Sequence, residues 1–199
     1  EIKTTYVPQT GGSFSGINSV NHLSGAEVPT FGVGVDVEAE AGRNVIPMRA
    51  DSVGLDTFVH VPKGTPIFNP AAVDFKFNVT SASDYVLWTR VEAFDSTDDS
   101  FLVTVYDPTG TPVVFGYGAT AAHFRLETAS PAYPYATFSW TQVNHWNPYN
   151  TPSEYLNPVV YHLVPGVYQV QVRPRELGTR LDKIRLSYYC PDLDQDGYT

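Results

Sequence analysis

Three carboxylates recur at every second position of the segment Val35–Ala41, where Asp36, Glu38 and Glu40 alternate with small apolar residues. In a β-strand, side chains two positions apart point to the same face and lie about 6–7 Å apart. Three acids at this spacing repel one another, so either their face is solvated or a cation neutralises it. Because hard oxygen ligands suit calcium best, calcium is the cation that this pattern favours.

Another acid lies in the segment Leu181–Tyr188, which alternates as a strand does. In that alternation Asp182 shares a face with Ile184 and Leu186, which are expected to point into the core. A carboxylate that points into a core needs a partner, because an unpaired buried charge is costly. Calcium or an arginine could supply that partner.

The long connection Asn144–Pro158 carries aromatic rings among Asn, Pro, Ser and Glu, without an apolar period that would bury them. A pyranose packs its C–H face on a flat ring, while its hydroxyls need donors and acceptors nearby. The connection offers both, so it predicts a sugar site. The alternative is that the rings cover the edge of the domain or pack on the N-terminal linker. The candidate platform is Trp146, Tyr149 and Tyr155, with Asn147, Asn150 and Glu154 as polar partners.

Outside this connection, Asp99 is an additional candidate for sugar binding. Arg90 and Asp99 nevertheless fit a structural ion pair better than a sugar clamp. Trp88 and Trp140 fall inside expected strands, and we expect them in the core rather than on a concave binding face.

Catalytic motifs are missing from the sequence. The five histidines show no metal-ligand spacing and no Ser/His/Asp arrangement, and no glycine-rich segment links a strand to a helix as a phosphate loop would. The acids of Val35–Ala41 are neighbours on one expected face, which suits a cation better than acid and base roles across a cleft. The sequence therefore predicts a non-catalytic protein. A polysaccharide lyase or hydrolase on a jelly roll is the alternative, and turnover would reveal it.

The elements that position these residues are short strands. The chain holds 13 Tyr, 11 Phe, 15 Gly and 16 Pro among its 199 residues, which favours strands joined by many turns. About eight period-two segments predict an all-β jelly-roll β-sandwich of two antiparallel sheets. The predicted strands are Val35–Ala41, Thr57–Val61, Val73–Val79, Tyr85–Glu92, Phe101–Tyr106, Ala136–Val143, Val167–Arg173 and Leu181–Tyr188.

Three segments divide the chain. Residues 1–33 are rich in Gly, Ser, Thr and Asn and are expected to be a linker or an edge segment, and residues 34–189 form the sandwich. Residues 190–199 are acidic: Asp192, Asp194 and Asp196 followed by Gly197 resemble the start of a calcium loop, although the acid that should complete it is absent. The alternative is a disordered acidic tail. Cys190, the only cysteine, could pair outside this sequence.

Acidic residues outnumber basic ones by 21 to 12, which gives a formal net charge of −9. Such a chain repels phosphate backbones, so nucleic acid is excluded as a partner. No apolar run is long enough to insert into a membrane. The net charge also argues against sulfated or uronic glycans, although a local cationic patch could reverse this. The candidates for that patch are Arg173, Arg175, Arg180, Lys183 and Arg185.

The chain resembles the galactose-binding-like β-sandwich modules, in particular carbohydrate-binding families 6 and 35 and the C-terminal domain of family 115 glycoside hydrolases. The resemblance rests on four stretches in order: Glu38–Gly42 with Pro47 and Met48, Tyr85–Val91, Asp99–Phe101, and Arg175–Ile184. It implies a structural calcium with Glu38, Glu40 and Asp182 among its ligands. It also implies sugar binding at edge loops or on a concave face. The tail resembles a thrombospondin type 3 or dockerin-like repeat.

These observations predict a non-catalytic polysaccharide-binding module that keeps an attached enzyme or adhesin on its glycan. The expected partners are a polysaccharide and covalently linked neighbouring domains, in a secreted or cell-surface bacterial protein. The alternative is a structural or adhesion spacer that separates modules of a surface protein and binds no glycan.

Overall fold

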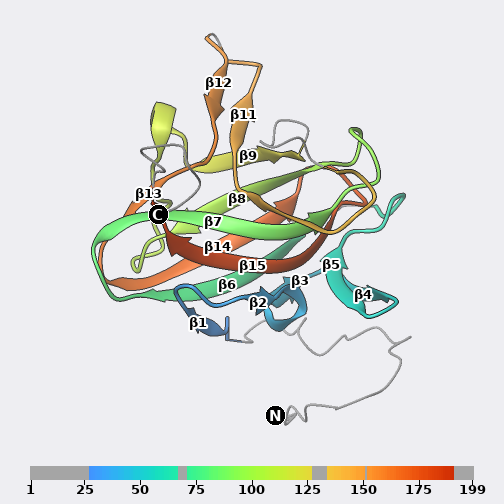
Figure 1. Ribbon diagram of the computed structural model, residues 1–199, viewed down its shortest axis with the longest axis horizontal. Coiled ribbons are helices and arrows are strands. Elements are labelled where there is room, and N and C mark those ends of the chain that lie inside the picture. Colours follow the sequence, from blue (N-terminus) through green and yellow to red (C-terminus); the bar gives the residue numbers. More distant parts are fainter. Residues whose placement is uncertain (1–26, 67–70, 127–133, 151, 191–199) are drawn as a thin grey trace.

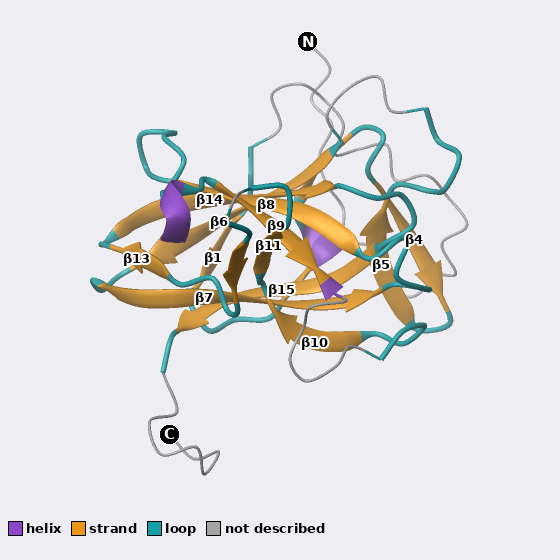
Figure 2. Ribbon diagram, turned by 90° about the horizontal axis from the view of Figure 1, so that it is seen from above, coloured by secondary structure: helices purple, strands orange, loops and turns teal. Residues whose placement is uncertain are grey.

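The computed structural model describes residues 27–66, 71–126, 134–150 and 152–190. They form two β-sheets packed face to face, with a separate hairpin that projects from one end of the sandwich (Figures 1 and 2). Asp192, Asp194 and Asp196 of the predicted calcium loop lie outside the described residues. Within the described part of the chain, no helix is long and apolar enough to cross a membrane.

Sheet A follows the order β1-β6-β14-β8-β9, with β3 beside β6. Strand β1 runs parallel to β6, and the other pairs are antiparallel. The bounds are β1 (Thr30–Gly32), β3 (Arg43–Val45), β6 (Ala72–Val79), β8 (Ser100–Tyr106), β9 (Ala121–Arg125) and β14 (Gly166–Pro174).

Sheet B follows the order β10-β7-β15-β5-β4, with β13 beside β7 and β2 beside β15. A third sheet is the hairpin β11-β12, and the described residues also include the short 3-10 turns η2 and η3. The bounds are β2 (Val37–Glu38), η2 (Ala39–Ala41), β4 (Arg49–Val53), β5 (Asp56–His60), β7 (Ser83–Glu92), β10 (Ser139–Gln142), β11 (His145–Asn147), η3 (Gly116–Gly118), β12 (Glu154–Leu156), β13 (Tyr161–Leu163) and β15 (Arg180–Tyr188).

The core lies between the two sheets and consists of alternate strand residues. In β6, Phe75 and Phe77 are fully buried, while the intervening Lys76 is only partly covered. Leu87 of β7 and Ile184 of β15 close the core from the other sheet. The predicted all-β jelly-roll sandwich of two antiparallel sheets is therefore confirmed, and most of the predicted strands coincide with β5, β6, β7, β8, β14 and β15.

The segment predicted as the strand Val35–Ala41 is different. Only Val37–Glu38 pairs with β15, and the chain then turns into η2, which places Ala39 in the core. Directly after it, Gly42 packs so closely on β6 that an added Cβ would lie 2.6 Å from Val73 Cγ2 and 2.7 Å from Phe75 Cε1. The prediction that three acids line one face of a strand is wrong, because this tight turn ends the strand.

The two tryptophans expected in the core also lie elsewhere. In β7 the inward positions are Leu87 and Thr89, so Trp88 between them faces away from the core and is half-buried. Trp140 of β10 is 37% exposed, and the Arg185 guanidinium carbon lies 4.9 Å from the centroid of its ring. Both rings therefore lie on the outer face of sheet B.

The packing of Gly42 leads to a stability prediction. Gly42→Ala should lower the free energy of unfolding by about 1–3 kcal/mol, because the added methyl group overpacks the contact with Val73 and Phe75. Chemical denaturation would measure this. Gly32→Ala is the matched control, since its nearest neighbour, Val35 Cγ2, would lie at an ordinary contact distance of 3.6 Å. Equal stability of the two variants would contradict the prediction.

Candidate functional site

The connection predicted to bind sugar folds into the hairpin β11-β12. Trp146 lies opposite Tyr155, and Asn147 lies opposite Glu154. Directly opposite residues of a hairpin share a face, so Trp146 and Tyr155 lie on one side of it. The hairpin stands clear of the sandwich, with β11 packed next to β9 at its base (Figure 1). The structure thus brings the predicted aromatic and polar candidates of this segment together.

The three rings of the hairpin are exposed to different degrees. Tyr149 is 79% exposed and Tyr155 is 47% exposed, so both side chains are accessible to solvent. Trp146 is half-buried, and the Arg125 guanidinium carbon lies 4.7 Å from its ring centroid. Arg125 thus covers part of Trp146, which fixes that ring at the base of the hairpin. The two tyrosines are the rings that a ligand can reach.

The polar candidates hold the hairpin in shape. Glu154 Oε1 accepts a hydrogen bond of 2.7 Å from Asn150 Nδ2, and Glu154 Oε2 lies 3.0 Å from His145 Nε2. Asn147 Oδ1 accepts a bond of 3.3 Å from the Tyr149 backbone N–H. The hydrogen bonds from His145 and then Asn150 lower the pKa of Glu154, so this carboxylate is ionised at neutral pH.

The base of the hairpin contains a pair of histidines. His145 is buried, and its Nδ1 accepts a bond of 3.1 Å from the His123 backbone N–H. In the neutral ring the hydrogen therefore sits on Nε2, which donates to Glu154. The His123 ring packs edge-on against His145, and its buried Nδ1 has no hydrogen-bond partner among the described residues. Burial, followed by the neighbouring His145, lowers the pKa of His123.

A further ring belongs to this surface and was not predicted. Tyr117 of η3 is 57% exposed and donates a 3.3 Å hydrogen bond from its hydroxyl to the Tyr155 carbonyl oxygen. Its φ of 62° is in the left-handed region, which non-glycine residues rarely adopt and which is often found at binding sites. The only sequence signal for Tyr117 was its position between Gly116 and Gly118, in a connection between β8 and β9 that is too long for a simple turn.

Asp99 does not join this surface. It is 1% exposed, accepts a 2.9 Å hydrogen bond from the Tyr135 hydroxyl, and donates its backbone N–H to Glu176 Oε2 at 3.1 Å. A carboxylate buried in this way supports the start of β8 rather than contacting a polymer. Arg90 pairs instead with Asp56, at 3.0 Å, and with Asp182.

The acids predicted to bind calcium lie near the contact between η2 and β15. Glu38 pairs with Lys183 at 2.6 Å, and the buried Asp182 pairs with Arg90. An arginine therefore partners Asp182, one of the two possibilities considered. Glu40 Oε2 is buried and has no hydrogen-bond partner among the residues that the structure describes. Burial raises the pKa of Glu40, and the nearby carboxylates of Glu38 and Asp182 raise it further.

The charges of these acids favour a bound cation, but their positions do not form a complete coordination site. Three carboxylates repel one another here, and one buried oxygen lacks a hydrogen-bond partner in the described part of the chain, which a cation would correct. Within the described residues, however, no three His, Cys, Asp or Glu side chains are placed so that they could hold a metal ion.

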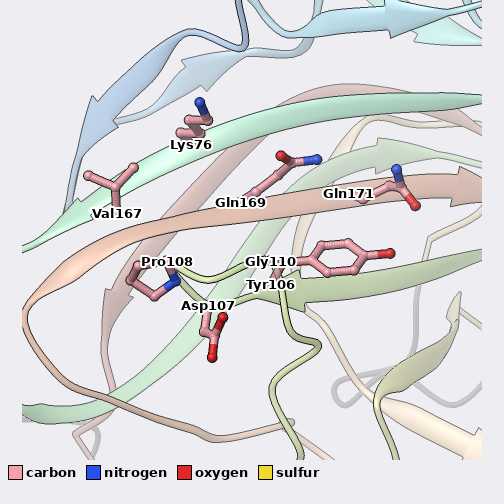
Figure 3. A pocket seen from close by; sticks show the side chains of 8 residues that line it. All are labelled: Lys76, Tyr106, Asp107, Pro108, Gly110, Val167, Gln169 and Gln171. Carbon is pink, nitrogen blue, oxygen red and sulfur yellow. The ribbon is translucent and has the colours of Figure 1, made fainter.

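A second surface, which was also not predicted, lies on the outer face of sheet A. A groove with a volume of about 430 Å³ runs over β6, β14 and β8 and the turn after β8 (Figure 3). This volume is within the range of small-ligand sites. The lining residues are Lys76, Tyr106, Asp107, Pro108, Gly110, Val167, Gln169 and Gln171.

The predicted cationic patch is not free to attract a ligand. Four of its members are held by carboxylates: Arg175 by Glu176, Arg180 by Glu92, Lys183 by Glu38 and Arg185 by Asp36. Their charges are therefore neutralised locally. Arg173, on the outer face of β14, is the member without such a pair among the described residues.

Known structures share this fold. No family model matches the chain, and no curated protein matches its sequence. An isomalto-dextranase of Arthrobacter globiformis, complexed with panose, is similar over 76% of this chain with a TM-score of 0.52 and 14% identity. The chain spans 22% of the length of that protein. At this identity the likeness shows a shared fold.

Two carbohydrate-binding modules are similar over more of their own length. CBM6cm-2 from Cellvibrio mixtus lichenase 5A, solved with cellotriose, is 16% identical, with 79% of this chain and 99% of that chain covered and a TM-score of 0.49. CsCBM6-3 from Clostridium stercorarium, solved with cellobiose, is 11% identical, with 80% and 98% covered and a TM-score of 0.49.

The His123 environment leads to a prediction about pH. Because the folded state lowers the pKa of His123, protons bind the unfolded chain more readily, and stability should fall as pH drops below about 6.5 toward the folded pKa. His60, whose pKa burial also lowers, should act in the same direction. His123→Leu should reduce the loss of melting temperature between pH 7.5 and 5.5. Thermal melts across that range would show it, and an unchanged pH dependence would contradict the proposed environment.

Proposed function

We propose that this chain is a non-catalytic module that binds polysaccharide through the β11-β12 hairpin. The observation that carries the proposal is the pair of solvent-exposed rings, Tyr149 and Tyr155, on a projecting hairpin whose polar side chains are already fixed by hydrogen bonds. Sugar rings pack on such flat faces, and an ordered site loses little conformational entropy on binding. The shared fold supports this assignment.

Binding at one hairpin suits a targeting role better than a catalytic one. A projecting two-stranded element can touch a polymer chain along its length, whereas acid and base catalysis needs groups that face each other across a cleft. Affinity per module should be modest, so retention on an insoluble glycan relies on attached domains and avidity. We therefore propose that the module holds a secreted or cell-surface enzyme or adhesin on its glycan.

A structural calcium is part of the proposal. Glu38, Glu40 and Asp182 would supply carboxylate oxygens to it, and the ion would relieve their mutual repulsion where η2 meets β15. Lys183 pairs with Glu38 and Arg90 pairs with Asp182, so calcium binding requires both ion pairs to open.

The hairpin is tested by affinity electrophoresis through gels that contain plant and marine polysaccharides. Tyr155→Ala should weaken retardation by the bound glycan about tenfold or more, because burying one aromatic side chain is worth about 1.5–3 kcal/mol. Tyr149→Ala should have an effect in the same direction. Tyr188→Ala is the matched control, since Tyr188 is equally exposed at 47% but ends β15 of sheet B.

The outcomes separate the candidate functions. Retardation that survives Tyr188→Ala but not Tyr155→Ala supports binding at the hairpin. Equal retardation of all variants places the glycan elsewhere and overturns the proposed site. If a folded wild-type protein migrates unchanged in every gel, the spacer function replaces glycan binding, and the hairpin becomes a candidate protein interface.

The calcium proposal has its own test. At a calcium concentration of 100 times its dissociation constant, the folded state should gain about 2.7 kcal/mol relative to protein in chelator, which raises the melting temperature by several degrees. Glu40→Gln should remove most of this gain and should stabilise the protein in chelator, because it removes a buried charge next to two other acids. The exposed Glu27→Gln is the control. Identical melting of the wild type in calcium and in chelator would contradict the site.

A further inference from the structure

The groove on the outer face of sheet A contains a lysine with an unusual electrostatic setting. Lys63 pairs with Asp98 and Lys183 pairs with Glu38, whereas Lys76 has no carboxylate within ion-pair distance among the described residues. In a chain of net charge −9, most cations find an acid, so an unpaired lysine in a hollow is a distinctive feature. Its ammonium group is available to an external anion.

The strand register places amide groups beside this lysine. Gln169 of β14 lies directly opposite Lys76 of β6, and Gln171 lies two residues further along the same face. Gln171 Nε2 donates a 3.0 Å hydrogen bond to Asp74, which leaves its carbonyl oxygen to accept from a hydroxyl. Figure 3 shows the Lys76 amino group and both amides extending from neighbouring strands at the groove. Together they offer donors to an anion and acceptors to hydroxyls.

Asp107, the one acid among the described residues that line the groove, does not compete for Lys76. Asp107 Oδ1 accepts hydrogen bonds from the Thr109 backbone N–H at 2.9 Å, from the Thr109 hydroxyl at 2.6 Å and from the Thr111 backbone N–H at 2.9 Å. The Thr109 hydroxyl, followed by the turn amides, lowers the pKa of Asp107. In Figure 3 this carboxylate points away from Lys76. Its charge is therefore satisfied within its own turn.

The outer face of β14 extends the positive character of the groove. Arg173 points to the same face as Gln169 and Gln171, because residues two apart in a strand share a face. Like Lys76, it has no carboxylate partner in the described part of the chain. Tyr106 of β8 lies directly opposite Gln169 of β14 and adds an aromatic ring to the groove. Cation, amide and ring together match an acidic sugar better than a neutral one.

We propose that this groove recognises an acidic sugar unit, one that carries a carboxylate or a sulfate ester, and that the ammonium group of Lys76 pairs with that anionic group. This rests on the proposed polysaccharide-binding function and adds a class of glycan to it. The hairpin supplies ring contacts to a polymer, and the groove selects polymers with anionic units. The overall negative charge of the protein opposes binding of an anionic polymer elsewhere on its surface, so an acidic sugar unit is attracted only where a local cation is unpaired.

The test compares acidic polymers with neutral polymers of the same backbone. Wild-type protein is run through gels that contain polygalacturonate or its carboxyl-reduced form, and a sulfated galactan or its desulfated form. We expect retardation about tenfold stronger in one acidic gel than in its neutral counterpart, which identifies the anion as carboxylate or sulfate. Lys76→Gln should abolish that difference, and Lys76→Arg should keep most of it. Lys63→Gln, with the same change in net charge, should leave it unchanged.

Each result decides between the two proposals. Equal retardation in the acidic and neutral forms overturns the acidic-sugar inference while polysaccharide binding stands. Equal losses in Lys76→Gln and Lys63→Gln also overturn it, because net charge alone would then explain the preference. Tyr155→Ala should weaken retardation in both forms while the ratio between them persists. No retardation of the folded wild-type protein in any gel overturns both the inference and the function on which it rests.

Discussion

The burial of alternate residues between two sheets is the constraint on which the rest of this molecule depends. In β6, Phe75 and Phe77 fill the space between the sheets, so Lys76 between them must face outward. The same rule on β14 places Gln169 outside whenever Tyr168 and Val170 are inside. A slip of one residue would exchange these sets, placing a charge in the core and a ring in the groove. The apolar core therefore fixes the chemistry of the outer face as firmly as it fixes stability.

This rule explains which parts of the structure could be predicted from sequence. Strands such as Val73–Val79 carry their alternation in their own residues, so their direction and buried face could be predicted locally. The turn at Ala39–Ala41 could not, because it depends on the contact between Gly42 and β6, which lies some 30 residues further along the chain. Trp88 was misplaced for a related reason: a large apolar ring suggests a core, whereas its position in the alternation places it outside.

The candidate site, too, could be predicted from the sequence only in part. The composition of Asn144–Pro158 was enough to gather the aromatic and polar candidates, but not to show that Arg125 covers part of Trp146 while Tyr149 and Tyr155 are exposed to solvent. Cover of this kind comes from β9, a strand that the sequence did not reveal. The same limit applied to the cations. Counting Lys and Arg residues predicted a cationic patch near the C-terminal strands, but a cation is available to a ligand only where no carboxylate pairs with it. That pairing is set by the fold and could not be predicted from the sequence.

The hairpin must stay ordered although little of the core supports it, and its base shows how this is achieved. An isolated two-stranded hairpin is marginal in water, so β11-β12 needs anchors on the sandwich. His145 provides one: its buried ring accepts the His123 backbone N–H on one side and donates to Glu154 on the other. Glu154 then holds Asn150 near the tip. A continuous set of hydrogen bonds thus runs from sheet A to the exposed end of the hairpin, which keeps Tyr155 in place before any ligand arrives. The position of the exposed rings is therefore set by a buried histidine as much as by the hairpin itself.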